Sequence, residues 1–289
     1  MKHLALLALA LTLPAGTLAQ GRRARPDAAT RADASAAPAD AAPTDDPTAG
    51  FDALLGAVVR GGGVDYGALR ARVSELRAYH DWLATHGPAT TPAAFASASA
   101  RKAYWLNAYN ATVLRGVAEA PASMGNVLTH LPDNGFFRAR RWRVDGRERT
   151  LDEMENREVR DVFHDARVHM ALNCAARSCP PLRAGAYRAD RVDRQLDEQA
   201  ARYVNAAGNV AVDEAARTVR LSQLFEWFGA DFAARVPGRA ASPMRGALAF
   251  VHSFASPELR ARLEAACGPD GARCTLAYAA YDWSLNRAR

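Results

Sequence analysis

The sequence predicts a single α+β domain, with helices packed on a mainly antiparallel sheet. Amphipathic helical segments recur along residues 51–289, and short alternating strands come in pairs joined by turns. Strands joined by tight turns pair antiparallel, and the helices between them cover the resulting sheet. No linker-like stretch divides this segment, whose length of about 240 residues suits one large domain.

The first fifty residues are expected to lie outside this domain. Residues 1–19 have a basic start, an apolar run from Leu4 to Leu13 and small residues up to Ala19, which is typical of a secretory signal peptide. Residues 20–50 are rich in Ala, Pro and Asp and contain no aromatic residue, so a disordered linker is expected. The chain is therefore predicted to be exported, to the periplasm or outside the cell. No transmembrane segment is expected, because no run reaches the ~20 apolar residues that a spanning helix needs.

The net charge of +6 comes almost entirely from arginine, since Lys2 and Lys102 are the only lysines. Apart from a cluster between Arg138 and Arg143, the arginines are scattered and no aromatic residues alternate with them. This distribution is typical of a solvated surface, so no nucleic-acid partner is expected.

Two helices are expected in the first half of the domain. Residues 67–86 carry apolar side chains at helical spacing and end before Gly87-Pro88. Residues 93–119 are apolar on most of the helix circumference, which predicts a position in the middle of the core. Asn107 and Asn110 share one face of this helix, and buried amides need hydrogen-bond partners. They are candidate binding residues near a site.

Two strand pairs and several helices complete the domain. Asp145-Gly146 predicts a hairpin, and Thr150 with Glu153 predicts a capping box for a helix that carries Glu155. Residues 210–228 also predict a strand, a turn, a strand and a helix in that order, with Ser222 as the helix cap. Further helices are expected at residues 191–206, 243–254 and 257–266, followed by a last strand within residues 275–283.

Four cysteines are present, at positions 174, 179, 267 and 274, and the export signal places them where disulfides persist. Cys267 and Cys274 bracket a Pro-Asp-Gly turn that brings the chain back on itself. A structural disulfide between these two residues is therefore expected.

The concentrated chemistry lies in the sequence HMALNCAARSCP, residues 169–180. A strand is predicted over residues 166–174, and its alternation would put His169 and Asn173 on a polar face. The same alternation would direct Cys174 to the core, where a thiol is an inert apolar group.

Cys179 differs because it directly precedes Pro180, a residue type favoured at the first position of a helix. Cys179 is therefore predicted to be a helix N-cap. The positive end of the helix dipole would then lower the pKa of its thiol and favour the nucleophilic thiolate.

Three interpretations of this stretch remain open. In the first, Cys179 is the nucleophile of a cysteine hydrolase or acyl transferase acting on amide or peptide bonds, His169 is its base, and Glu155 or Asn173 orients the imidazole. In the second, a disulfide between Cys174 and Cys179 stabilises a binding module without catalysis. The third is a metal site of His169 and the two cysteines, although the spacing matches no standard zinc motif. Because the metal site is the least favoured of the three, no residue is assigned as a metal ligand, and no cofactor is expected.

Aromatic residues near the C-terminal half receive a structural interpretation. Trp227 and Phe228 are expected in the core, and Tyr281 and Trp283 are expected to anchor the last strand. Alternatively, the same final block places Asp282 or Asn286 beside the thiol to orient His169.

Four blocks, YWLNAYNA, HMALNCAARSCPPL, LSQLFEWFGADF and YDWSLN, resemble the domain of unknown function 547 family. The resemblance runs from about Val64 to Asn286. It implies an exported or membrane-associated bacterial module whose activity is unassigned, and a distant relation to papain-like and transglutaminase-like thiol folds. In such folds a cysteine at a helix start meets a histidine on a strand. The substrate would be an unidentified small molecule or peptide, and the sequence does not predict the oligomeric state.

Overall fold

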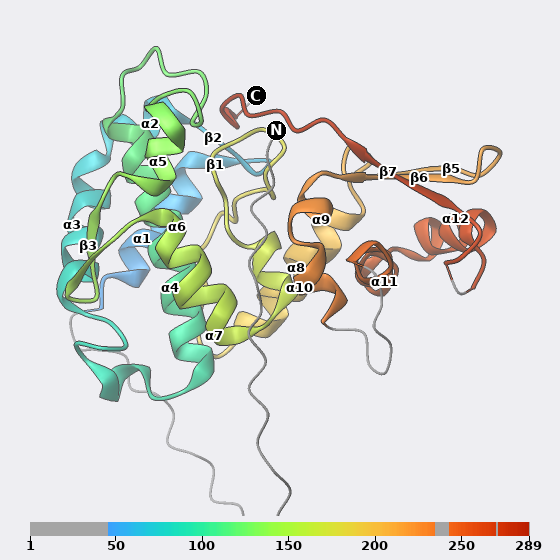
Figure 1. Cartoon of the computed structure of the whole chain (residues 1–289). Helices are drawn as coiled ribbons and strands as arrows, with labels where there is room; N and C mark the ends of the chain where they lie inside the picture. Colours follow the sequence, from blue (N-terminus) through green and yellow to red (C-terminus); the bar gives the residue numbers. More distant parts are fainter. Residues whose placement is uncertain (1–45, 235–242, 270, 289) are drawn as a thin grey trace, which may run out of the picture. The chain divides into compact units, whose positions relative to one another are not determined.

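The computed structural model describes residues 46–234, 243–269 and 271–288 (Figure 1). The predicted signal peptide, and the predicted linker up to residue 45, lie outside the described residues. Helix α1 (Thr48–Val58) begins within the last residues assigned to that linker and buries Phe51, Leu54 and Leu55. The described part is an α+β domain, as predicted.

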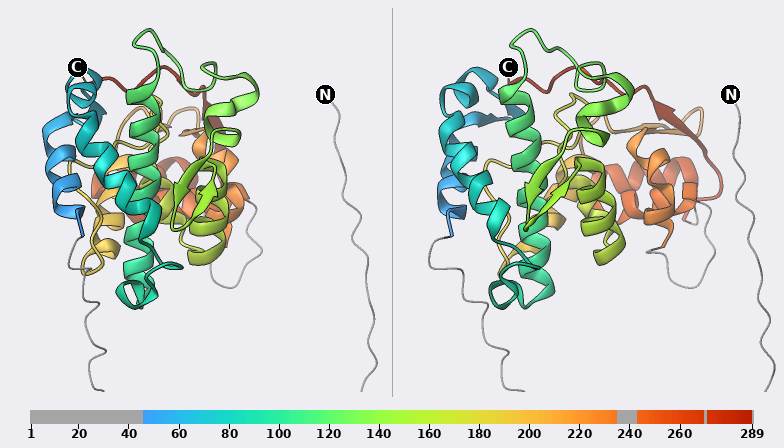
Figure 2. Two further views of the ribbon diagram at one scale, coloured as in Figure 1. Left: turned by 90° about the vertical axis from the view of Figure 1, so that its left-hand side faces the viewer. Right: turned by 60° about the vertical axis from the view of Figure 1, so that its left-hand side comes forward.

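The first group of elements surrounds helix α4 (Ala98–Glu119), which is buried along most of its length. Its start is capped by Ser97, whose side chain accepts a hydrogen bond from the backbone N–H of Ala100. Because α4 is apolar on most faces, it is covered from several sides, and Figure 2 shows α3 alongside it. The elements that precede α4 are β1 (Val59–Arg60), β2 (Gly63–Val64), α2 (Tyr66–Ala71), α3 (Val73–Thr85) and η1 (Pro92–Phe95).

The predicted helix over residues 67–86 is interrupted at Arg72, which separates α2 from α3. After α4, the expected hairpin is present as the antiparallel pair β3 (Trp142–Val144) and β4 (Arg147–Arg149). The predicted capping box is also confirmed, with both of its hydrogen bonds formed between Thr150 and Glu153. It starts α6 (Leu151–Glu153), which continues into a π-helical segment, η3 (Met154–Arg160). The neighbouring short elements are η2 (Pro132–Asn134), α5 (Gly135–Arg138) and α7 (Asp161–Phe163).

The strand predicted over residues 166–174 is wrong. Residues Ala166–Met170 form a 3₁₀ helix, η4, whose first turn is capped when Asp165 accepts a hydrogen bond from the N–H of Arg167. The polar and apolar residues that alternate here do not lie on separate solvent-facing and core-facing sides, because His169 and Met170 are both buried. The alternation therefore occurs in a buried segment, and periodicity alone does not distinguish such a segment from a half-exposed strand.

The helix expected to begin at Pro180 is also absent, since residues 180–187 are irregular. The carbonyl oxygen of Pro180 accepts from the side chain of Asn173, and the N–H of Leu182 donates to Gly62. These partners replace the hydrogen bonds of a first helical turn. Cys179 is therefore not an N-cap, and no helix dipole acts on its thiol.

The second group of elements contains a three-stranded sheet with β6 in the centre (Figure 1). β5 (Val210–Asp213) pairs antiparallel with β6 (Thr218–Ser222), and β7 (Thr275–Ala279) pairs parallel with β6. The described strands thus form three small sheets, of which this one is mixed. The helices of this group are α9 (Leu224–Trp227), α10 (Gly229–Ala233), α11 (Pro243–Phe254) and α12 (Pro257–Cys267).

Helix α8 (Val192–Val204) contributes to two apolar cores. Val192 and Leu196 belong to the core around α4, whereas Ala200 and Tyr203 belong to the core around β6. After β7 the chain returns to the first group, where Ser284 and Leu285 bridge to Asn126 and Ala176. Among the described helices, none combines the length and apolar character needed to span a bilayer.

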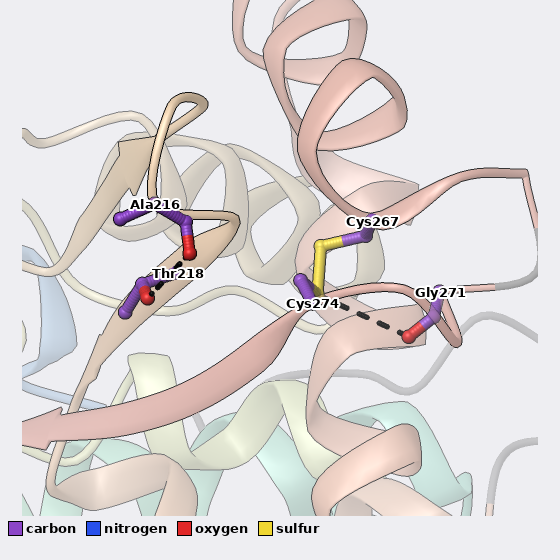
Figure 3. The surroundings of a disulfide bond; sticks show 5 residues. All are labelled: Ala216, Thr218, Cys267, Gly271 and Cys274. Atoms are coloured by element: carbon purple, nitrogen blue, oxygen red, sulfur yellow. Dashed lines mark hydrogen bonds between the residues drawn. A yellow bond between two sulfur atoms is a disulfide. The ribbon is translucent and has the colours of Figure 1, made fainter.

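Cys267 and Cys274 form a disulfide bond. Figure 3 shows that it joins the end of α12 to the segment leading into β7. The bond closes the short turn between the last helix and the last strand, next to the β5–β6 turn.

Candidate functional site

A cavity of about 330 Å³ brings together the residues with reactive side chains, and we call it the thiol cavity. Its size falls within the range of small-ligand sites. It lies at the meeting of η3, η4, α9, the segment after η4 and the final segment of the chain. Its lining residues include Tyr109, Arg138, Asp152, Glu155, Arg160, His169, Leu172, Cys174, Cys179, Trp227, Phe228, Tyr281 and Trp283.

Both cysteines of the cavity are free thiols in contact with each other. The two Sγ atoms are 2.7 Å apart, and the backbone N–H of Cys174 donates to Cys179 Sγ at 2.8 Å. Cys174 is half-buried and its Sγ lies 3.4 Å from the hydroxyl of Tyr281, whereas Cys179 is 9% exposed. We call residues 174–179 the cysteine loop.

The two thiols have different acidities. Burial opposes ionisation of Cys174, but hydrogen bonds with Cys179, Tyr281 and the backbone of Ala176 outweigh it and lower its pKa. Burial raises the pKa of Cys179, and the adjacent Cys174 adds to this effect. Ionisation of a pair in contact occurs in two steps, because a first thiolate accepts a hydrogen bond from the remaining thiol. The first proton is therefore lost from Cys174, the more accessible member.

Asn173 holds the cysteine loop closed. Its Nδ2 donates to the carbonyl of Pro180 at 2.7 Å, and its Oδ1 accepts from Ala175 N at 3.0 Å and from Asn286 Nδ2 at 3.2 Å. Ala175 has a φ of 62°, a left-handed conformation that costs a non-glycine residue energy. The buried amide of Asn173 thus stabilises a strained loop and makes no contact with His169 among these bonds.

His169 is paired with Asp231. The Nε2 atom lies 2.7 Å from Asp231 Oδ2, and Arg160 donates to both oxygens of the same carboxylate. The hydrogen bond from His169, against partial burial and with help from Arg160, holds the pKa of Asp231 well below its usual range. An ionised carboxylate only accepts, so Nε2 carries the proton and the neutral ring has Nδ1 unprotonated. Nδ1 makes no hydrogen bond within the described part of the chain.

The imidazole is held rigidly and kept neutral. It is 2% exposed and stacks on the ring of Phe228, with centroids 4.0 Å apart. Burial lowers the pKa of His169, although Asp231 favours the charged form. At neutral pH the ring can therefore accept a proton at Nδ1, as a general base does.

Glu155 contributes a second carboxyl to the cavity from η3. Its Oε2 accepts a hydrogen bond from the hydroxyl of Tyr109 at 3.2 Å. Burial raises the pKa of Glu155, against the effect of this hydrogen bond. In the structure Glu155 is bonded to Tyr109, and Asp231 is the residue bonded to His169.

Three aromatic side chains form one wall of the cavity, and we call Trp227, Tyr281 and Trp283 the aromatic wall. Trp227 stacks on Trp283 with centroids 5.6 Å apart, and Tyr281 is 4.6 Å from Trp283. The prediction that Trp227 belongs to the core is wrong, since it is 43% exposed. The side chain of Asp282 bonds to Ser284, and that of Asn286 bonds to Tyr66 and Asn173, so neither orients His169.

Asn107 and Asn110 lie outside the lining of the thiol cavity. Asn107 exchanges two hydrogen bonds with the backbone of Tyr187, at 2.9 and 2.8 Å. Asn110 donates to Ala171 O and accepts from Asn173 N, at 3.0 and 2.9 Å. Both amides of α4 therefore position the irregular segments on either side of the cysteine loop.

The metal alternative has no support in the geometry. Within residues 46–234, 243–269 and 271–288, no group of three His, Cys, Asp or Glu side chains is arranged to hold a metal ion. The Nε2 atom of His169 is directed at Asp231 instead.

Sequence reasoning missed Asp231, Arg160 and Tyr109. Arg160 follows Glu155 by five residues, so a π-helical turn brings both to the cavity, but π-helical spacing has no sequence signature of its own. Asp231 stands in the block LSQLFEWFGADF, which carries part of the family resemblance. The resembling blocks contain three carboxylates, Glu226, Asp231 and Asp282, so they narrow the partner of His169 to these candidates.

The comparisons with known proteins give one match. A family model described as "Protein of unknown function, DUF547" matches residues 94–204. No curated protein and no solved structure matches the chain, so the relation to papain-like and transglutaminase-like folds stays a prediction. This match to residues 94–204, which contain Glu155, His169 and both free cysteines, supports a relationship of the chain to the DUF547 family of proteins of unknown function.

Proposed function

We propose that the thiol cavity is the active site of a cysteine-dependent hydrolase or acyl transferase that acts on amide or peptide-type bonds. We also propose that the protein is exported and acts in the periplasm or outside the cell. One observation carries the proposal: two free thiols and an imidazole fixed by a carboxylate line the same cavity. A nucleophile, a base and a group that orients the base are the parts that acyl transfer requires.

Cys174 is the nucleophile in this proposal, in place of Cys179. Cys174 is the more exposed thiol, and its pKa is the one that is lowered. The case for Cys179 depended on a helix after Pro180, which does not form. Cys179 instead supports the thiolate of Cys174 through the contact between the two sulfurs.

His169 transfers the proton in both halves of the reaction. Nδ1 of His169 takes the proton of the Cys174 thiol, and the thiolate attacks the carbonyl carbon. A thioester forms as the carbon–nitrogen bond breaks, and the leaving amine takes that proton from the imidazolium of His169. Water or an acceptor amine then attacks the thioester, giving its proton to Nδ1 and releasing the thiolate. Asp231 keeps the proton on Nε2 and stabilises the imidazolium between the two steps.

The apolar side of the cavity suits the acyl portion of such a substrate. The aromatic wall borders Cys174 directly through the hydroxyl of Tyr281. Aromatic rings beside a reactive group provide a large contact area at low entropic cost.

The test is trapping of an acyl-enzyme on reduced protein. p-Nitrophenyl esters of N-acyl amino acids should release a burst of p-nitrophenol and leave an acyl adduct, located at Cys174 by intact mass and peptide mapping. Cys174→Ser and His169→Asn should abolish the adduct. His80→Asn is the matched control, because His80 is also buried but bonds to Thr112 away from the cavity.

An adduct that persists in Cys174→Ser would refute the assignment of the nucleophile. Reduced, folded protein that forms no adduct at either thiol would favour the alternative, a disulfide-stabilised binding module without catalysis.

A further inference from the structure

The contact between the two free sulfurs is closer than a hydrolase needs. Their separation of 2.7 Å compares with about 2.05 Å for a covalent disulfide, so a shift of less than about 1 Å closes the bond. A nucleophile for acyl transfer needs a base and an oriented carbonyl, and any hydrogen-bond donor could support its thiolate, so a second thiol is not required. The close second thiol therefore permits a reaction that acyl transfer does not use.

The cysteine loop does not need a disulfide to stay closed. The N–H of Arg177 donates to Ser284 O at 2.7 Å, and the N–H of Asn286 donates to Ala175 O at 2.9 Å. Asn173 closes the loop from inside with its three side-chain bonds. These contacts fix the loop while both thiols are reduced. A disulfide between them is therefore not needed for the structure and can form and break during a reaction.

The two sulfurs are also placed unequally. Cys174 is half-buried at the aromatic wall, whereas Cys179 is 9% exposed and its Sγ receives the N–H of Cys174. An incoming molecule therefore meets Cys174 first, and only the other thiol is close enough to Cys174 to react next. Attack by an accessible thiol and resolution by a buried partner is the geometry of thiol–disulfide exchange.

We propose that Cys174 and Cys179 are a redox-active pair that exchanges with accessible aliphatic disulfides, Cys174 as the attacking thiol and Cys179 as the resolving thiol. This activity goes beyond acyl transfer and does not depend on it, although both reactions use the cavity and Cys174. The shared chemistry is a disulfide bond, carried either by a small cysteinyl peptide or by a protein.

The exchange balances in two steps. The thiolate of Cys174 attacks one sulfur of R–S–S–R′, a mixed disulfide with R–S forms, and R′–S⁻ leaves with the bonding pair and takes up a proton. Cys179 then loses its proton, and its thiolate attacks Cys174 Sγ and expels R–S⁻, which is protonated. The protein is oxidised from two thiols to one disulfide, and R–S–S–R′ is reduced to RSH and R′SH.

The test uses the full folded chain with oxidised glutathione as the probe, followed by acid quenching and intact mass. Wild type should lose two hydrogens, with the new bond mapped between Cys174 and Cys179 and little glutathione adduct remaining. Cys179→Ser should accumulate a stable glutathione adduct at Cys174. Cys174→Ser is the matched control and should react at least tenfold more slowly, because its remaining thiol is buried.

Equal adduct formation by the two variants would overturn the proposal, as would wild-type protein that keeps two free thiols or stops at the mixed disulfide. If the variants do not fold, a titration of wild type in redox buffers decides: the proposal requires a reversible two-electron transition mapped to this pair. A second arm with a disulfide-bonded reporter protein distinguishes a protein source from a small peptide. Acyl-enzyme formation in Cys179→Ser without disulfide formation in wild type would support acyl transfer and refute thiol–disulfide exchange. Disulfide formation in wild type without an acyl-enzyme in Cys179→Ser would support exchange and refute acyl transfer.

Discussion

Removal of the Asn173 side chain should destabilise the protein and loosen the cysteine loop. Asn173 is 3% exposed and its amide makes three hydrogen bonds, to Pro180, Ala175 and Asn286. At about 1 kcal/mol for each, with further cost for partners left unsatisfied, Asn173→Ala should lower the free energy of unfolding by about 3 kcal/mol. Urea denaturation of the reduced protein, followed by fluorescence, measures this quantity.

A matched variant separates this effect from the general cost of losing an asparagine. Asn209 makes a single side-chain hydrogen bond, to Tyr203 O, so Asn209→Ala should cost about 1 kcal/mol. A second measurement reads the position of the thiols directly, since Cys179 should become open to iodoacetamide in Asn173→Ala. If both variants lose the same stability and Cys179 stays protected, the reasoning about the loop is refuted.

Three further predictions concern charge and covalent links. Asp231→Asn should reduce the rate of acyl-enzyme formation by about 10²- to 10⁴-fold, because an amide can donate to Nε2 and move the ring proton to Nδ1. The ¹⁵N chemical shifts of the His169 imidazole report the tautomer. An unchanged tautomer and rate would contradict the role of Asp231 in orienting His169. Despite its burial, Asp165 has its pKa held well below the usual value by Arg167 and Lys102. Asp165→Asn should therefore lower the free energy of unfolding by about 2–4 kcal/mol at pH 7. This contribution is complete above about pH 4 and is lost as the pH falls through the folded pKa. The difference in stability between wild type and variant should therefore narrow in acid denaturation curves. A gap independent of pH would count against the ion pair. Replacing both Cys267 and Cys274 by Ala opens a loop with a sequence separation of 7 and should cost about 2.5 kcal/mol in urea denaturation, and no measurable loss would show that the turn is held by other contacts.

The elements that the sequence predicted well are those with a local signal. The hairpin at Asp145-Gly146 and the capping box at Thr150 depend on neighbours within a few residues, and both are present. The long apolar run of α4 indicated burial from every side, which the structure has. Such features need no knowledge of the distant chain.

The predictions that depended on distant partners were less reliable. The alternation around His169 predicts a strand because the sequence does not show that Phe228 and Asp231 cover the predicted polar face. The helix after Cys179 fails because Asn173 and Gly62 take up backbone groups that a first turn would use. A residue about sixty positions away supplies the carboxylate of the site, and only the fold brings it there.

The measurement that tests the central claim most directly is the pH dependence of alkylation at each thiol of the reduced wild-type protein. We expect iodoacetamide to label Cys174 first, with a midpoint below the value of about 8.5 for an ordinary thiol, while Cys179 stays unlabelled until the protein unfolds. Labelling of Cys179 before Cys174, or labelling of neither below pH 8.5, would contradict the account of a polarised thiol pair in this cavity.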